Sequence, residues 1–215
     1  MWLQNKNGVE KIIKLLNKKY PNVKLVLIFS NPLEVLVATM LSAQCTDERV
    51  NKVTKSLFKK YRGIRDYARI DLRTFEEDIK PTGFYKNKAK NIIATCQKII
   101  KEFKGRVPQT MEELITLPGI GRKTANIILT FAFGKIEGIA VDTHVRRLSQ
   151  RLGLSKNSDP EKIEQDLMEI IPQKYWRKFS SLIIEHGRRV CLAKKPLCEK
   201  CILKHICPSF NYFVK

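Results

Sequence analysis

Acidic residues are scarce in this chain. Its 215 residues include 21 Asp and Glu against 41 Lys and Arg, so the formal net charge is 41 − 21 = +20. An excess of this size favours a polyanionic partner over an ordinary solvated surface. An anionic membrane surface would also attract the charge, but no lipidation motif is present to hold the chain there.

Long apolar runs, targeting signals and repeats are missing too. No apolar stretch is long enough to cross a membrane. Residues 1–20 are polar and lysine-rich where a signal peptide would be apolar. No repeat is visible at the periods of solenoid proteins. With 43% hydrophobic residues and 215 in all, the chain can form one domain or two small ones.

Strand signals are nearly absent, whereas helical periodicity and capping residues recur along the chain. One short segment, 23–29, is strand-like but has no partner to pair with, so we expect a loop or a helix there. Predicted helices cover residues 9–16, 32–41, 46–57, 89–103, 110–117, 122–133, 142–152, 159–170 and 175–189. The sequence therefore predicts an all-α fold.

Four of the six cysteines cluster near the C-terminus, at intervals of six, two and five residues: Cys191, Cys198, Cys201 and Cys207. Four thiolates in one short loop indicate a metal or iron–sulfur site. Structural zinc is the alternative, although zinc sites usually combine two close-spaced pairs and only one C-x-x-C is present. Two disulfides would be unusual in a chain without a secretion signal. Cys45 and Cys96 fall in apolar helical stretches and are expected to be buried thiols.

Residues 117–125 read LPGIGRKTA, a glycine hairpin that opens a helix. Gly119 and Gly121 can take positive φ without a steric penalty, which allows a sharp turn. The turn leaves backbone amides exposed at the start of the helix from Arg122, where an anion such as a DNA phosphate can bind. Many proteins use such a turn to bind DNA without catalysis, and it can also be an ordinary turn between helices.

Lys123 and Asp142 are the candidates for chemistry. Lys123 lies in the first turn after the hairpin, and a lysine amine can attack a carbon centre. Asp142, in the segment VDTH, would place a carboxylate at another helix start. The same residues also suit a phosphate-binding lysine and a plain N-cap. Spacing alone does not decide between these interpretations.

Three motifs in order resemble the endonuclease III family of the helix-hairpin-helix superfamily: LPGIGRKTAN, VDTHVRR and C-x6-C-x2-C-x5-C. The likeness begins at residues 41–44, LSAQ, and ends at Cys207. It implies an all-α, two-lobed protein: a six-helix domain over residues 23–134 and a second lobe from 1–22 plus 135–215. It also implies a bifunctional DNA glycosylase/AP lyase that acts on damaged pyrimidines in duplex DNA, and we expect these pyrimidines to be oxidised.

The resemblance also implies a role for each matching residue. Lys123 matches the nucleophile that forms a Schiff base, and Asp142 matches the carboxylate that stabilises the sugar cation. The four clustered cysteines match the ligands of a [4Fe–4S] cluster. Residues that match DNA contacts are Gln44, Phe84, Gly119, Gly121, Arg122, His144, Lys194 and Lys195.

The resemblance implies a specific role for Gln44 and for Phe84. Gln44 matches a residue that fills the gap left by the flipped nucleotide, and Phe84 replaces an apolar wedge that is often leucine. A polar helix end and a core aromatic are the plain alternatives for them. We expect a monomer that binds damaged double-stranded DNA, is cytoplasmic and nucleoid-associated, and does not bind membranes.

Other classes fit the sequence less well. Related adenine and thymine-mismatch glycosylases lack a lysine at the position of Lys123, and the adenine enzyme carries a further C-terminal domain for which we expect no room here. A non-catalytic DNA-binding module would not need Lys123 together with Asp142. An electron carrier would need neither the hairpin nor the charge of +20.

Overall fold

The computed structural model describes residues 6–23 and 27–214. All regular elements in these ranges are helical. The α-helices are α1 (Lys6–Lys19), α2 (Pro32–Leu41), α3 (Asp47–Lys60), α4 (Ile64–Arg69), α5 (Leu72–Ile79), α6 (Tyr85–Glu102), α7 (Met111–Leu114), α8 (Arg122–Phe133), α9 (Thr143–Arg151), α10 (Pro160–Ile170), α11 (Trp176–Arg189) and α12 (Phe210–Phe213). Short 3-10 turns are η1 (Lys80–Thr82), η2 (Gln173–Tyr175) and η3 (Cys198–Lys200).

The chain divides into two compact units. One unit comprises residues 26–137 and contains α2 to α8. The other joins residues 1–25 to 138–215, so that α1 packs with helices from the C-terminal part of the chain. No described helix is long and apolar enough to cross a membrane.

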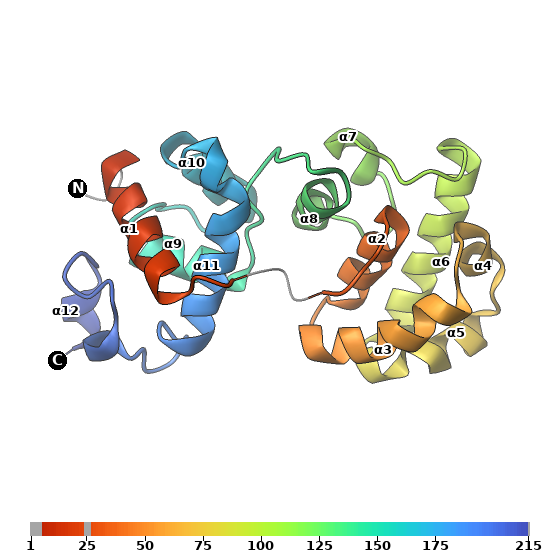
Figure 1. The fold of residues 1–215 in the computed structure, drawn as a ribbon, viewed down its shortest axis with the longest axis horizontal. Helices are drawn as coiled ribbons and strands as arrows, with labels where there is room; N and C mark the ends of the chain where they lie inside the picture. The colour runs from red at the N-terminus through yellow and green to blue at the C-terminus, as the bar shows by residue number, and fades with distance from the viewer. Residues whose placement is uncertain (1–5, 24–26, 215) are drawn as a thin grey trace. The chain divides into compact units, whose positions relative to one another are not determined.

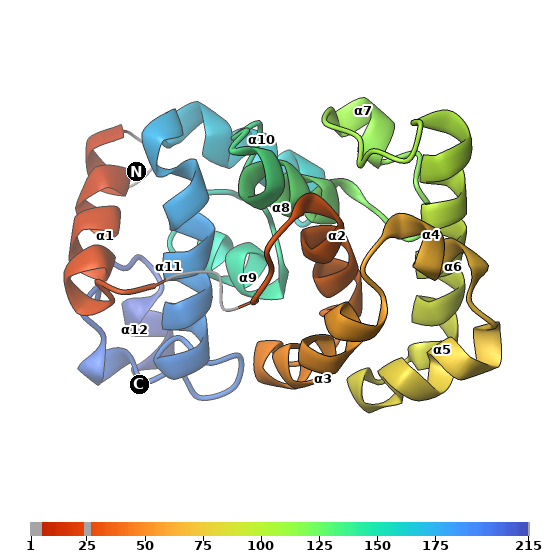
Figure 2. The ribbon, with the colours of Figure 1, turned by 45° about the vertical axis from the view of Figure 1, so that its right-hand side comes forward.

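The 26–137 unit is built around α2 and α6. Helix α2 packs against α8, and α6 packs against α4 and α5 (Figures 1 and 2). Residues 35–41 of α2 are all buried, because this apolar helix packs against α3, α6 and α8. The rings of Tyr61, Tyr67 and Phe75 pack together at centroid distances of 5.3–5.8 Å and connect the end of α3 to α4 and α5.

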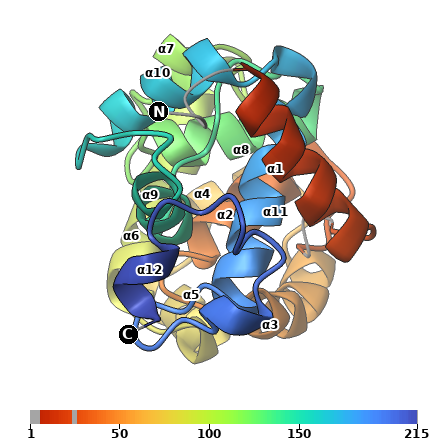
Figure 3. The same ribbon diagram turned by 90° about the vertical axis from the view of Figure 1, so that its left-hand side faces the viewer.

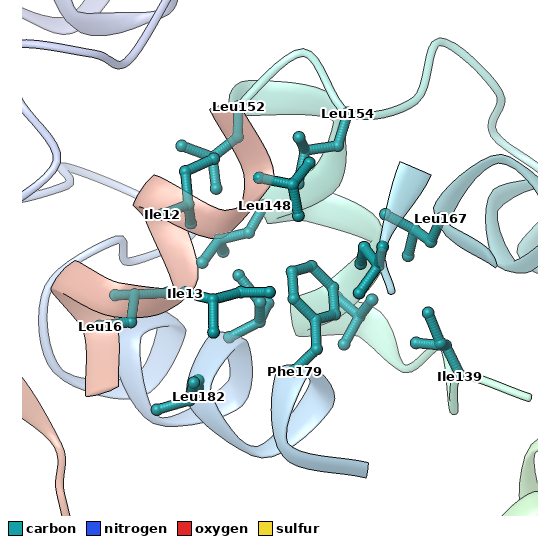
Figure 4. Close-up of a cluster of buried hydrophobic side chains, with 14 of the residues drawn as sticks. Ile12, Ile13, Leu16, Ile139, Leu148, Leu152, Leu154, Leu167, Phe179 and Leu182 are labelled. Carbon is teal, nitrogen blue, oxygen red and sulfur yellow. The ribbon is translucent and has the colours of Figure 1, made fainter. Parts of the chain in front are cut away.

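The other unit has an apolar core to which α1, α9, α10 and α11 contribute side chains. Figure 3 shows these helices as a ribbon. Phe179 of α11 is fully buried in it, among side chains from the other helices (Figure 4). Ile12 and Leu16 come from α1, and Leu148 comes from α9. The core therefore joins the N-terminal helix to the segment that carries the cysteines.

Helix caps agree with the sequence signals. The side chains of Asn31, Thr46, Asp142 and Asp159 accept hydrogen bonds from backbone N–H groups in the first turns of α2, α3, α9 and α10. Gly134 ends α8 with a left-handed φ of 69°. These caps explain why the predicted starts of these four helices lie within one residue of the observed ones, whereas α1 and α6 begin three and four residues before their predicted starts.

Some elements were not predicted. Helices α4 and α5, with 6 and 8 residues, are too short for the 3.6-residue period to show in the sequence. The prediction for Cys45 was wrong: it lies in the loop after α2 and is half-buried, whereas Cys96 is buried in α6. Residues 27–29 of the strand-like segment form no strand, and its residues 24–26 lie outside the described ranges.

Candidate active site and nucleic-acid interface

The glycine hairpin joins α7 to α8 and is held from the side by α6. The hydroxyl of Thr95 donates to the carbonyl of Pro118 at 2.8 Å, and the Nζ of Lys98 donates to the carbonyl of Thr116 at 2.9 Å. Gly119 has a φ of 74°, and a Cβ there would lie 2.7 Å from the Nδ2 of Asn91. Glycine is therefore required at this position for both its conformation and its small size.

The start of α8 has the features of an anion site. Gly121 is the N-cap and provides no side-chain hydrogen bond. The first N–H groups of a helix have no partner within it, and they carry the positive end of the helix dipole. Arg122 and Lys123 are the first two residues of this helix, and Lys123 is exposed. A phosphate can bind here, with an amine beside it.

Asp142 belongs to the other compact unit and caps α9. Its Oδ1 accepts hydrogen bonds from the N–H groups of His144 at 2.9 Å and Val145 at 2.8 Å. Both bonds end on the same oxygen, so the cap does not use Oδ2. The capping interpretation is therefore correct, and it still leaves one carboxylate oxygen for another role.

Gln44 and Phe84 are both exposed and both strained. Phe84 is 63% exposed, which rules out the core-aromatic interpretation. Their φ values are 52° and 49°, in the left-handed region that residues with a Cβ rarely occupy. Of the four non-glycine residues with such a φ in the described part of the chain, three are predicted DNA contacts: Gln44, Phe84 and Lys195. Strained residues concentrate at functional sites.

The remaining predicted DNA contacts lie in the unit that contains α9 and α11. His144 is half-buried in the first turn of α9, and its Nδ1 lies 3.2 Å from the Nη2 of Arg147. Lys194 and Lys195 are exposed in the loop that follows α11. They lie between the first two clustered cysteines, where two positive charges can reach a backbone phosphate.

The four clustered cysteines line one cavity, together with Arg151, His186 and apolar side chains. Among the described residues, no three His, Cys, Asp or Glu side chains are close enough to hold a single metal ion. A four-iron cluster has no need of that convergence, since its four thiolates ligate different iron atoms. The donor set, four half-buried sulfurs around one cavity, fits such a cluster.

Donors to these sulfurs are already in place. The N–H of Leu203 donates to the Sγ of Cys201 at 3.4 Å, and the Nη1 of Arg151 lies 3.4 Å from the Sγ of Cys191. Burial raises the pKa of the Cys201 thiol to about 11. Ligation requires the thiolate, so positive charge and N–H donors are needed around the sulfurs.

Two arginines of α9 organise the cysteine loop, and neither role was predicted from the sequence. Arg147 donates through Nη2 to the carbonyls of Gly187 and Cys191, at 3.1 and 2.9 Å. Arg151 donates to the carbonyls of Leu192 and Ala193, at 2.7 and 2.9 Å. Arg147 and Arg151 are one helical turn apart, which could have indicated a shared role, but this spacing is also typical of an exposed basic face.

His186 joins α1 to the cysteine loop. Its Nδ1 lies 3.1 Å from the hydroxyl of Tyr20, and its Nε2 lies 3.4 Å from the Sγ of Cys201. Burial lowers the pKa of His186 to about 4, so the ring is neutral at pH 7. A neutral ring has one donor and one acceptor, which matches one hydroxyl donor and one sulfur acceptor.

Known proteins share this architecture. Residues 37–173 match the family described as HhH-GPD superfamily base excision DNA repair protein. Endonuclease III of Synechocystis is 56% identical over 204 residues, covering 95% of this chain and 93% of its own. Endonuclease III of Bacillus subtilis is 43% identical over 204 residues, covering 94% and 93%.

A solved structure is also similar along its whole length. It is described as a trapped covalent intermediate of endonuclease III with DNA, and it superposes with a TM-score of 0.92 at 42% identity, covering 98% of this chain and 99% of the other. With the family match over residues 37–173, these likenesses confirm the resemblance of the three motifs. The chain therefore belongs to the HhH-GPD superfamily of base excision DNA repair proteins and, within it, to the endonuclease III family.

Proposed function

We propose that this protein is a bifunctional DNA glycosylase/AP lyase of base excision repair, which removes oxidised pyrimidines from duplex DNA and cleaves the strand at the resulting site. The observation that carries the proposal is the exposed amine of Lys123 at the start of α8, directly behind a glycine hairpin suited to phosphate. A covalent DNA intermediate of a 42% identical endonuclease III supports it.

Lys123 acts as the nucleophile. Its Nζ attacks C1′ of the damaged nucleotide, the C1′–N bond breaks, and the base leaves with the electron pair and takes up a proton. The C1′–O4′ bond of the resulting N,O-acetal then breaks, O4′ takes up a proton, and the nitrogen lone pair forms the C=N bond of the Schiff base. Loss of a C2′ proton then expels the 3′ phosphate oxygen with the electrons of the C3′–O bond, and water hydrolyses the imine to restore the amine.

Asp142 stabilises the positive charge that develops on the sugar. Its Oδ1 is held by two N–H groups of α9, so the carboxylate has one orientation, and Oδ2 is the oxygen that would face the sugar. Electrostatic stabilisation by a group oriented in advance is effective because nothing has to reorganise during the reaction.

The exposed residues perform the recognition. A base inside a duplex must be extruded, at a cost of about a few kcal/mol, and a damaged base costs less because it stacks and pairs poorly. Phe84 stacks on the orphaned base and Gln44 fills the gap. The hairpin amides and Arg122, together with His144, Lys194 and Lys195 of the other unit, contact phosphates without reading sequence.

The four clustered cysteines hold a [4Fe–4S] cluster, which supplies a rigid centre and a potential electron-transfer group when bound. The four sulfurs around one cavity, their N–H and arginine donors and the family likeness support this. The purified protein should be brown and contain about four irons and four acid-labile sulfides per chain. A colourless, active preparation with one zinc would contradict it.

We further propose that the protein is a monomer and that it works in the cytoplasm at the nucleoid.

The deciding experiment is borohydride trapping on abasic-site DNA. An imine is reduced to a stable amine, so the protein should become covalently joined to the DNA. Lys123→Gln should lose both trapping and strand cleavage yet still bind DNA, because the hairpin amides remain. Lys123 is exposed, so its replacement leaves the core intact.

Lys101→Gln is the matched control, since it removes one exposed charge from α6 in the same unit. It should trap DNA at the rate of the parent protein. Trapping by Lys123→Gln at the parent rate would place the nucleophile elsewhere. A parent protein that binds DNA but neither traps it nor releases the damaged base would instead be a non-catalytic DNA-binding module.

A further inference from the structure

Lys88 is a lysine in an unusual environment. It lies in α6 and is only 6% exposed, although lysine is almost never buried without a partner of opposite charge. Its Nζ donates to two backbone carbonyls, those of Leu41 at 2.8 Å and Thr82 at 2.9 Å. Burial lowers the pKa of Lys88. The cost of burying this amine is thus offset by contacts to carbonyls from two separate segments.

Both carbonyls lie just before an exposed, strained residue. Leu41 ends α2, and Gln44 follows three residues later with a φ of 52°. Thr82 ends η1, and Phe84 follows two residues later with a φ of 49°. Lys88 also donates its backbone N–H to the carbonyl of Phe84 at 3.2 Å. One side chain therefore joins the bases of the two loops that carry Gln44 and Phe84.

We propose that Lys88 is a positioning residue that holds Gln44 and Phe84 at a fixed separation, so that both enter the duplex together when the nucleotide is flipped. The inference rests on the proposed function, in which these two residues act on the DNA. All the groups involved belong to the same compact unit, residues 26–137.

A role in packing alone explains the arrangement less well. Even a buried ion pair can often be replaced by apolar side chains of similar size with no loss of stability. Leu41 provides one of the carbonyls that a helix end leaves unpaired, and a turn or a cap would normally satisfy it. Here a charged group reaches from another helix to do so, and it also ties the neighbouring loop. Strained backbone persists only where its surroundings over-determine it.

The test follows flipping in single-turnover experiments. The protein is mixed with a duplex that carries thymine glycol beside 2-aminopurine, whose fluorescence rises when stacking is disturbed. Lys88→Met, which keeps the length of the side chain without its donors, should slow this rise by about 10- to 100-fold, because small misplacements of interacting groups have large kinetic effects. Lys101→Met, an equal loss of charge at the other end of α6, should leave it unchanged.

A purely structural role of Lys88 would not predict the result expected in a second background. In a Gln44→Ala/Phe84→Ala background, Lys88→Met should slow the rise by less than about twofold, because interacting residues are non-additive. Equal slowing in both backgrounds, or no slowing by a folded Lys88→Met, overturns the proposal. If Lys88→Met does not fold, Lys88→Gln takes its place with the same expected outcomes, since its amide reaches one carbonyl at most.

The two proposals fail in different ways. Borohydride trapping of the parent protein on abasic-site DNA is measured in parallel, and its absence would refute the proposed function. Positive trapping by the parent, together with flipping by Lys88→Met as fast as by Lys101→Met, would refute the role of Lys88 alone.

Discussion

Gly119 should be the least replaceable glycine of the hairpin. Its φ is 74°, where an alanine costs about 1–2 kcal/mol. A Cβ there would also lie 2.7 Å from the Nδ2 and 3.0 Å from the Cβ of Asn91, and such overpacking costs about 1–3 kcal/mol. We therefore expect Gly119→Ala to lower the free energy of unfolding by about 2–5 kcal/mol.

Two other glycines separate the cost of the backbone conformation from the cost of the steric clash. Gly134 has a φ of 69°, and an added Cβ would meet nothing within 4 Å among the described atoms, so Gly134→Ala should cost only the backbone term of about 1–2 kcal/mol. Gly121 has a φ of −93° and similar open space, so Gly121→Ala should cost less than about 1 kcal/mol. The free energies come from urea unfolding followed by circular dichroism, with a check for two-state behaviour.

The reasoning also predicts a partial rescue. Asn91→Ala removes the Nδ2 and Cγ atoms but keeps the Cβ at 3.0 Å, so Gly119→Ala should cost less in that background. A cost for Gly119→Ala no larger than that for Gly134→Ala would refute the steric argument. It would mean that the Asn91 side chain moves aside freely.

Three further predictions concern the rest of the molecule. In a plot of log K against log salt concentration for undamaged DNA, the slope should be roughly −4 to −5 if about five phosphates are contacted. Lys194→Ala should reduce the magnitude of this slope by about 1. A slope near zero for the parent protein would exclude DNA as its partner. Asp142→Asn keeps a capping side chain and should fold and bind DNA, yet slow base release sharply in single-turnover assays; a parental rate would leave Asp142 a plain cap. If the proposed cluster is present, its brown colour should fade faster in air in Arg151→Met than in the parent protein, because the cysteine loop loses two carbonyl contacts; equal fading would show that Arg151 does not stabilise the loop.

Local signals were enough to predict most helices and the chemistry-bearing motifs. Asn31, Thr46 and Asp159 cap helices through their own side chains, so the starts can be read from a few neighbouring residues. The spacing of the four clustered cysteines and the hairpin at 117–125 are likewise properties of short segments. The roles of Lys123 and Asp142 stay predictions, because they belong to different compact units and depend on the DNA.

Contacts between distant segments decided the remainder. Helices α4 and α5 are too short to be stable by themselves and exist because their side chains pack on α6. The sequence permitted Phe84 to be a core aromatic, and only the folded chain shows it exposed on a left-handed backbone. No local pattern marks Lys88 as buried, because its partners are carbonyls that lie 47 and 6 residues away. Sequence by itself determined where the capped helices begin and which chemistry is available, since caps and spacings act over a few residues. Tertiary structure alone decided which polar groups are buried and which apolar ones face water, since burial depends on every neighbour at once.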